Sequence, residues 1–353
     1  MAGHILELIK IFVFSGIAFA TVFLLMPVFL NLLYKFRIGK NIREQSSDGK
    51  LAHIFQSLHL KKKGTPTMGG ILVWGVVLFV ILLSRLASYL GFINHSLLDR
   101  GEVYLPLLTL LTVGFLGAVD DYLNVKDFGF IKGMNAKMKM LWLFIFSTLG
   151  AFWFYFKLGY ESIHVPGVGD FGIGMWYIPL FIFIIIASSN AVNITDGLDG
   201  LASGLLIIAF GAFAILAFMA GHSSLAAFCM IVASGLGAFL WFNIPPAKLF
   251  MGDTGALAFG ATLGVIAMMT NSLLVLPLIG FIFVLETITS GLQLFWKRFF
   301  KKKLFAIAPL HHLLEHKGWP EYTIVMRLWI IGAGVAGIGL MIGLVGMGVN
   351  SAL

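Results

Sequence analysis

The stretch YIPLFIFIIIASSNAVNITDGLDGLASGLLIIAFGAFAILAFM, residues 177–219, places a polar segment between two long apolar runs. Each run is close to the ~20 apolar residues that a helix needs to cross a bilayer. Within the polar segment an amide or carboxylate side chain recurs at every third position: Asn190, Asn193, Asp196 and Asp199. The pattern predicts two membrane helices joined by a polar turn, with the polar side chains along one face where the segment is helical.

The same apolar character extends along the whole chain of 353 residues, of which 59% are hydrophobic and 11% charged. The mean hydropathy of +0.97 implies more apolar surface than a water-soluble core can bury. We therefore expect an all-α polytopic integral membrane protein with one membrane domain, residues 1–353. About ten transmembrane helices are predicted, at residues 11–34, 68–90, 103–123, 140–158, 174–192, 198–220, 224–243, 253–270, 273–296 and 322–349.

The basic residues are unevenly distributed between the loops that join these runs. Five alternate loops, at residues 35–67, 124–139, 193–197, 244–252 and 297–321, hold 19 of the 24 lysines and arginines. The positive-inside rule places these loops in the cytoplasm and both termini outside it. Much of this charge, Lys301–Lys303 included, is typical of topology and of attraction to anionic lipid. The expected location is the cytoplasmic (inner) membrane, and nucleic acid is not an expected partner.

Several ionisable residues fall on the same predicted cytoplasmic face, at the ends of the apolar runs. They are Asp120, Asp121, Asp196, Asp199, Asp253, His311 and His312. Each has a simpler interpretation as a solvated helix end, a helix cap or a surface histidine. Their coincidence on one face favours a shared functional site, because ionisable groups at membrane depth are costly.

Clustered carboxylates suit a cation, and carboxylate oxygens are the ligands that Mg²⁺ prefers. The segments NITDGLDG and FMGDTGA place an acid and glycines at the beginning of a predicted helix, where backbone N–H groups favour phosphate. A Walker A motif is absent from the sequence, which excludes a P-loop site. The residue types favour metal-assisted phosphoryl transfer at a membrane surface, with an active site facing the cytoplasm.

Six motifs together resemble the phospho-N-acetylmuramoyl-pentapeptide transferases, within the superfamily of polyprenyl-phosphate N-acetylhexosamine-1-phosphate transferases. They are KKGTPTMGG (62–70), VDDY (119–122), NAVNITDGLDGLA (190–202), WFN (241–243), FMGDTGALAFG (250–260) and PLHHLLEHKGWPE (309–321). The resemblance implies a ten-helix bacterial membrane enzyme, typically a homodimer. It also implies Mg²⁺-dependent transfer of phospho-MurNAc-pentapeptide from UDP-MurNAc-pentapeptide to undecaprenyl phosphate, yielding lipid I and UMP for peptidoglycan synthesis.

The resemblance also implies roles for individual residues. The catalytic set is Asp120, Asp121, Asp253 and His311, with Asp120 as the candidate base for the lipid phosphate and Asp253 as the Mg²⁺ ligand. The substrate-binding set is Lys62, Thr67, Lys132, Asn193, Asp196, Asp199, Asn243, Phe250, Gln293 and His312. Gln293 is included for its place in the predicted helix and not for the resemblance, and there it faces the cleft or packs between helices. An approach of Asp196 to the metal stays open. The family's histidine triplet is incomplete here, because Leu313 stands at its third position.

Three other functions fit parts of the sequence. A related enzyme that transfers another HexNAc-1-phosphate from a UDP-sugar shares the aspartate motifs. An ion-coupled transporter predicts polar residues near the bilayer midplane, whereas these acids collect at one surface. A lipid-binding scaffold leaves five clustered aspartates unexplained. Within the favoured reading, one-step transfer competes with a two-step route that uses Asp253 as a covalent nucleophile.

Overall fold

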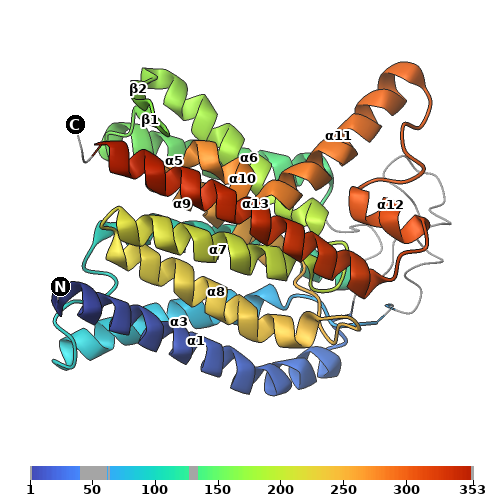
Figure 1. The fold of residues 1–353 in the computed structure, drawn as a ribbon. Helices are drawn as coiled ribbons and strands as arrows, with labels where there is room; N and C mark the ends of the chain where they lie inside the picture. Colours follow the sequence, from blue (N-terminus) through green and yellow to red (C-terminus); the bar gives the residue numbers. More distant parts are fainter. Residues whose placement is uncertain (1, 40–61, 63, 127–133, 351–353) are drawn as a thin grey trace.

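The computed structural model describes residues 2–39, 62, 64–126 and 134–350, and most of them are helical (Figure 1). Its long helices are α1 (Ala2–Lys35), α3 (Gly70–Tyr89), α4 (Tyr104–Lys126), α5 (Ala136–Phe152), α6 (Tyr177–Thr195), α7 (Leu201–Met219), α8 (Ser223–Asn243), α9 (Asp253–Met269), α11 (Phe281–Phe300) and α13 (Glu321–Asn350). Two short helices, α10 (Leu276–Ile279) and α12 (Leu310–His316), precede α11 and α13.

Among the described residues, eight helices are long and apolar enough to cross a membrane, as expected for a polytopic membrane protein. They coincide with eight of the ten predicted runs. Of the other two runs, α9 has only 17 residues, or about 25 Å of helix. The other run, 273–296, is bent and meets the criteria of length and apolar character only as a pair of helices. The total of ten spans therefore stays a prediction.

The prediction of one continuous helix over 273–296 is wrong. The chain breaks at Gly280, and the segments Leu273–Ile279 and Phe281–Phe300 meet at an angle of 82°. Gly280 leaves the helical dihedral angles, with φ −97° and ψ 28°. Glycine has the conformational freedom for this break and little preference for a helix interior. As a result α11 projects away from the other helices (Figure 1).

Helix α9 forms the centre of the fold. Every residue from Thr254 to Met269 is buried, and the helix packs mainly against α4 and α6, with further contacts to α3 and α7. Gly260 allows the approach of α6, because a Cβ there would lie 2.6 Å from the carbonyl oxygen of Ser188. Small residues are common where membrane helices approach closely. A helix enclosed in this way need not match the full thickness of the bilayer.

The segment after α5 departs from the all-α prediction. Strands β1 (Ser162–Val165) and β2 (Gly169–Gly172) form an antiparallel hairpin in which Ser162 pairs with Gly172 and Val165 with Gly169. The turn uses Gly167 at φ 77°, a conformation that glycine adopts easily. This turn makes a hairpin possible where the sequence pattern indicated only a loop.

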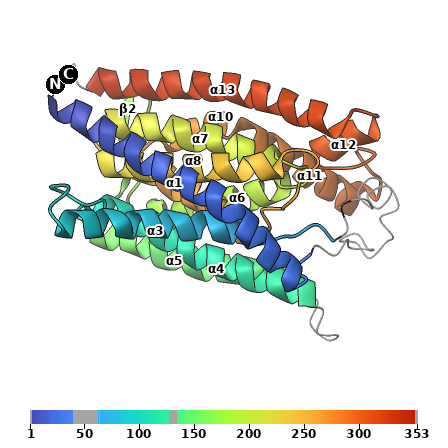
Figure 2. The same ribbon diagram turned by 90° about the horizontal axis from the view of Figure 1, so that it is seen from below.

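The two ends of the helical bundle differ in what they carry. The N-terminus, the C-terminus and the β-hairpin lie at one end, and α12 lies at the other (Figures 1 and 2). We refer to these as the hairpin end and the α12 end. The first residue of α9 and the last turns of α4, α6 and α8 lie at the α12 end, which therefore gathers most of the predicted site residues.

Candidate active site

A single lysine holds two of the predicted aspartates together at the α12 end. The Nζ atom of Lys139, in α5, lies 2.5 Å from Oδ2 of Asp120 on α4. The same Nζ pairs with Oδ2 of Asp253, the first residue of α9. Asn193, near the end of α6, donates from Nδ2 to Oδ1 of Asp253 at 2.8 Å. Four helices thus bring one ammonium, two carboxylates and an amide together; we call these four residues the carboxylate cluster.

Asp120 is fully buried, and hydrogen bonds fix both of its oxygens. The backbone N–H of Met134 donates to Oδ1 at 2.6 Å, and Nδ2 of Asn124 donates to Oδ2 at 3.0 Å. One turn earlier, a Cβ on Gly117 would lie 2.3 Å from the carbonyl oxygen of Asp253. This glycine therefore permits the close approach of α4 and α9 that lets Asp120 share an ammonium with Asp253.

Asp121 caps the beginning of α9. Its Oδ2 accepts hydrogen bonds from the backbone N–H of Thr254 at 3.0 Å and from the Thr254 hydroxyl at 2.7 Å. The backbone N–H of Asp253 donates to Oδ1 at 3.2 Å. A carboxylate is favourable at a helix N-terminus, where free N–H groups carry partial positive charge. These contacts give Asp121 a role in orienting Asp253, and its predicted catalytic role stays a prediction.

A second cluster surrounds the ammonium of Lys62. Its Nζ lies 2.6 Å from Oδ1 of Asp199 and 2.5 Å from Oε1 of Glu321, the first residue of α13. The Asp199 backbone N–H also donates to Glu321 at 2.8 Å, and the backbone N–H of Ala247 donates to Oδ2 of Asp199 at 2.9 Å. We call Lys62, Asp199 and Glu321 the Lys62 cluster. It joins the turn after α6 to the beginning of α13.

Burial and ion pairing shift the pKa of Lys62 in opposite directions. Burial favours the neutral amine, but the nearby Asp199 and Glu321 carboxylates outweigh it and raise the pKa of Lys62 above its ordinary value. The ammonium is therefore charged at neutral pH, and it compensates two acids. With that charge present, the polar turn is stable in a largely apolar surrounding.

The predicted nucleotide-binding residues lie beside this turn. Asn243, the last residue of α8, accepts from the Gly200 backbone N–H at 3.1 Å and from the Ser203 hydroxyl at 2.9 Å, and donates to the Leu249 carbonyl at 2.8 Å. Thr67 is buried, and its Oγ1 would lie 2.8 Å from a Cβ on Gly252. Phe250 is half-buried. The structure thus brings these residues to the α12 end.

The two predicted histidines lie beside carboxylates, and the predicted glutamine is bonded to a loop. His311 is fully buried beside Glu286 of α11, while Nδ1 of His312 lies 2.7 Å from Oε2 of Glu315. Gln293 is occupied by the loop after α11: its Oε1 accepts from the backbone of residues 304 and 305 at 3.0 and 2.9 Å. Its predicted role in substrate binding stays a prediction.

The roles of two further predicted residues, Asp196 and Lys132, stay predictions. Asp196 directly follows α6 as its C-cap, where its backbone N–H donates to the Val192 carbonyl at 3.0 Å. Its side chain is half-buried, and an approach to a metal stays untested. Lys132 lies outside the described residues, so its predicted role in the cleft stays a prediction.

Comparison with known proteins covers nearly the whole chain. The Glycosyl transferase family 4 model matches residues 103–271. Phospho-N-acetylmuramoyl-pentapeptide-transferases from Chloroflexus aurantiacus and Staphylococcus epidermidis are 35% and 36% identical, covering 96% and 94% of this chain and 91% and 99% of the relatives. A third relative, from Bacillus pumilus, is 37% identical over 90% of this chain and 93% of its own length. The chain belongs to the phospho-N-acetylmuramoyl-pentapeptide-transferase family.

The carboxylate cluster of this family member suits a divalent cation. No three His, Cys, Asp or Glu residues in the described part of the chain are grouped as a ready-made metal site. Mg²⁺ does not require such a group, because it commonly binds one or two carboxylates and completes its shell with water and substrate phosphates. Asp120 and Asp253 already direct oxygens at one ammonium. Their donor set therefore fits Mg²⁺, with the Asn193 amide orienting Asp253.

Sequence reasoning missed three charged members of this end of the transferase. Lys139 was counted only as a loop charge, Glu321 was counted only as the last residue of the loop 297–321, and Glu286 had no assigned role. For Lys139 the available signal is Asn135, which caps α5 by accepting from the Met138 N–H at 2.9 Å. That cap begins a helix before Lys139, so the lysine is held on a rigid element.

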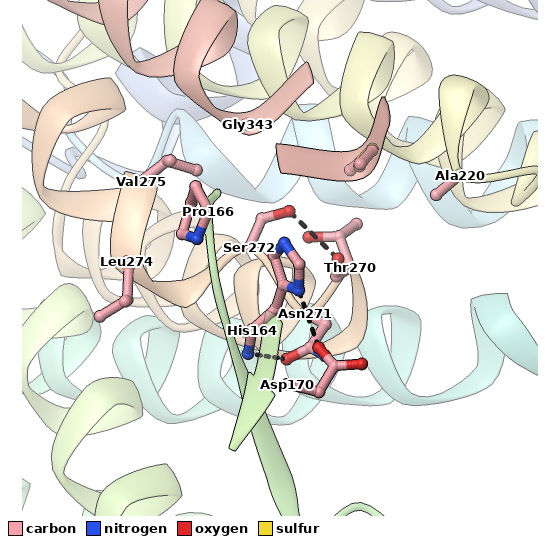
Figure 3. Close-up of a pocket in the computed structure, with 11 residues that line it drawn as sticks. His164, Pro166, Asp170, Ala220, Thr270, Asn271, Ser272, Leu274, Val275 and Gly343 are labelled. Carbon is pink, nitrogen blue, oxygen red and sulfur yellow. Dashed lines mark hydrogen bonds and ion pairs between the residues drawn. The ribbon is translucent and has the colours of Figure 1, made fainter. Parts of the chain in front are cut away.

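The hairpin end, opposite to the end that carries these clusters (Figures 1 and 2), contains a cavity of about 220 Å³ (Figure 3). Its polar lining consists of His164, Asp170, Thr270, Asn271 and Ser272, and the remaining lining residues are apolar or glycine. Nδ1 of His164 lies 2.7 Å from Oδ1 of Asp170. The lining includes neither lysine nor arginine, so this cavity lacks the cations that a diphosphate substrate requires.

Proposed function

We propose that this chain transfers phospho-MurNAc-pentapeptide from UDP-MurNAc-pentapeptide to undecaprenyl phosphate, producing lipid I and UMP for peptidoglycan synthesis. The observation that carries the proposal is the carboxylate cluster, in which Asp120, Asp253 and Lys139 converge from three helices. Relatives of 35–37% identity that bear the transferase name support the same activity. The cluster supplies both the anionic groups for a cation and a cation for phosphate.

The products define which bond breaks. The sugar keeps one phosphate and UMP keeps the other, so an oxygen of the lipid phosphate attacks the sugar-linked phosphorus and the bridging P–O bond breaks. Phosphoryl transfer depends mainly on alignment and on neutralising charge. A bound Mg²⁺ would supply charge neutralisation for the diphosphate. Asp253 and Asp120 are the residues that would hold it.

The chain's own residues then align the two substrates. Asp120 is fixed by hydrogen bonds from Met134 and Asn124, which suits it to orient or deprotonate the lipid phosphate. The Lys139 ammonium, which pairs with both carboxylates, is positioned to donate to a phosphate oxygen of a substrate bound beside them. Asp121 holds the N-terminus of α9 in place beside Asp253. The favoured route is a single transfer, because both oxygens of Asp253 are already held, Oδ2 by Lys139 and Oδ1 by Asn193.

The Lys62 cluster is suited to the nucleotide part of the substrate. It lies at the turn that carries Asp196 and Asp199, next to Asn243. The Lys62 ammonium and the neighbouring Asn243 amide can bind the polar groups of a uridine, provided that the turn keeps its position. The basic loops favour a cytoplasmic orientation for this end, which suits a cytosolic nucleotide and a lipid carrier in the inner leaflet. A homodimer in the cytoplasmic membrane completes the proposal.

The proposal is tested by measuring UMP release from the purified protein in detergent. With Mg²⁺ and undecaprenyl phosphate present, UDP-MurNAc-pentapeptide should yield UMP, whereas UDP-GlcNAc should not. Chelation of Mg²⁺ should abolish release, and added Mg²⁺ should restore it.

Each alternative gives a different result in the same assay. UMP release from UDP-GlcNAc alone would identify the related HexNAc-1-phosphate transferase. No UMP from either sugar nucleotide would contradict the proposal and leave a transporter or a lipid-binding scaffold. A phosphorylated protein trapped with UDP-sugar in the absence of lipid would contradict the single-step route.

A further inference from the structure

Glu286 is a carboxylate buried in α11, a helix that exposes apolar side chains such as Ile288 and Phe295 elsewhere on its surface. Burying a carboxylate is costly unless other groups bind to it. Among the described residues, its carboxylate makes polar contacts only with His311. The His311 backbone N–H lies 3.2 Å from Oε1 and 3.3 Å from Oε2, and ring Nδ1 lies 3.1 Å from Oε2. Glu286 therefore fixes the beginning of α12.

The imidazole of His311 touches the polar turn between α6 and α7. A Cβ on Gly197 would lie 2.2 Å from Nε2 and 3.0 Å from Cε1, so the ring packs directly against the backbone of the turn. The ring is 0% exposed. Neither ring nitrogen has an aligned hydrogen bond within the described part of the chain, although Nδ1 is within ion-pair distance of Glu286. In this arrangement the ring contacts the protein on every side.

The same turn is held from another side by the Lys62 cluster. Asp199 pairs with Lys62, its N–H donates to Glu321, and its Oδ2 accepts from Ala247. The turn at residues 196–199 is therefore fixed by α13 through one carboxylate and by α12 through one imidazole. A change in either support will move Asp196 and Asp199.

We propose that Glu286 and His311 are positioning residues. Glu286 holds His311 at the beginning of α12, and the His311 ring supports the turn that presents Asp196 and Asp199 to the nucleotide–sugar. This inference rests on the proposed function and deepens it. It gives His311 a role in shaping the substrate site, in place of the catalytic role that the family resemblance implies.

Exchanging bulk between Gly197 and His311 tests the contact directly. Gly197→Ala should raise KM for UDP-MurNAc-pentapeptide about tenfold with kcat changed less than about threefold, because a lost binding contact appears mainly in KM. The double variant Gly197→Ala/His311→Ala should return to the KM of His311→Ala alone, since the clash is gone. Two outcomes overturn the proposal: effects that multiply in the double variant, or a fall in kcat of about a hundredfold in His311→Ala at unchanged KM.

Glu286→Gln tests the other half of the proposal. Glu286→Gln should raise the KM for UDP-MurNAc-pentapeptide and should have no further effect in the His311→Ala background. Glu286→Asp, which keeps a carboxylate, should raise this KM less than Glu286→Gln does. An equal loss in both backgrounds would mean that Glu286 does not act through His311. The matched control is Glu102→Gln: Glu102 Oε1 lies 3.0 Å from Nδ1 of His222 at the hairpin end. Its kcat and KM should stay within about twofold of wild type.

Thermal unfolding separates this inference from the proposed function. Gly197→Ala should lower Tm and the double variant should recover it, and neither result requires any transferase activity. A wild-type protein that releases no UMP contradicts the proposed function alone. If Glu286→Gln does not fold, the Gly197–His311 pair still decides the inference, and a Tm that does not recover in the double variant overturns it.

Discussion

The two ends of the bundle use charged residues in different ways. At the α12 end, acids from several helices converge on two ammonium groups, so that Lys139 contacts Asp120 and Asp253, and Lys62 contacts Asp199 and Glu321. At the hairpin end, ion pairs link one acid to one neighbour, as in Arg85–Asp99 at 2.5 Å. Convergence of acids on a shared cation therefore distinguishes the proposed active site from the hairpin end better than the presence of charge or a cavity does.

Histidine–carboxylate pairs sharpen the same contrast. The Glu286–His311 pair is fully buried, with both side chains 0% exposed. The Glu102–His222 pair leaves 23% and 39% of its side chains exposed. Water therefore compensates the second pair but not the first. The buried pair is expected to influence substrate binding, whereas the exposed pair is expected to affect stability only slightly.

The largest expected effect is that of Asp253→Asn. Removing this carboxylate eliminates one of the two groups that suit Mg²⁺, so UMP release should fall roughly a thousandfold. Mg²⁺ titration of the residual activity should show weakened dependence on the metal, while nucleotide binding is retained. Nearly normal activity in this variant would break the assignment of the α12 end as the active site.

The next effect is that of Lys139→Met. Asp120 and Asp253 then lose their common cation and repel each other, and UMP release should fall about a hundredfold. The matched control is Lys157→Met, at the opposite end of the same helical segment, where the lysine is exposed. Equal losses of UMP release in the two variants would contradict a specific role of Lys139 at the α12 end.

Glu321→Gln should have a smaller effect. It removes one of the two acids that compensate Lys62 and weakens the contact with the turn at Asp199. KM for the UDP-sugar should rise about tenfold with little change in kcat, because the loss concerns binding. Steady-state kinetics at varied nucleotide concentration measure it. A fall in kcat at constant KM would instead connect this cluster to the chemical step.

The smallest effect is expected at the hairpin end. The hydrogen bond from Glu102 raises the pKa of His222 above its ordinary value despite burial. A raised pKa in the folded state stabilises the protein below the unfolded pKa of about 6.5, and this contribution is lost as pH rises through the folded pKa. The Tm difference between wild type and Glu102→Gln should therefore be present at pH 5.5 and disappear at alkaline pH, once His222 is neutral in the folded state; it corresponds to less than ~1 kcal/mol. A difference that grows with pH would contradict this.

Much of the fold follows from the sequence, because apolar runs predict where helices cross the membrane and basic loops predict their orientation. Eight predicted runs coincide with long helices, and Asp120 and Asp253 indeed meet. The bend at Gly280 and the β-hairpin were missed, because single glycines and short turns interrupt a pattern without altering its hydropathy. Lys139 was missed for another reason: its contact with Asp253 spans 114 residues and depends on how α4, α5 and α9 pack.

The most direct test of the central claim is the stoichiometry of UMP release and lipid product formation with and without undecaprenyl phosphate. The account predicts no UMP without the lipid acceptor, and one UMP for each lipid product when the acceptor and Mg²⁺ are present. UMP released at a comparable rate without the acceptor would contradict the account, because it would indicate hydrolysis or a covalent enzyme intermediate.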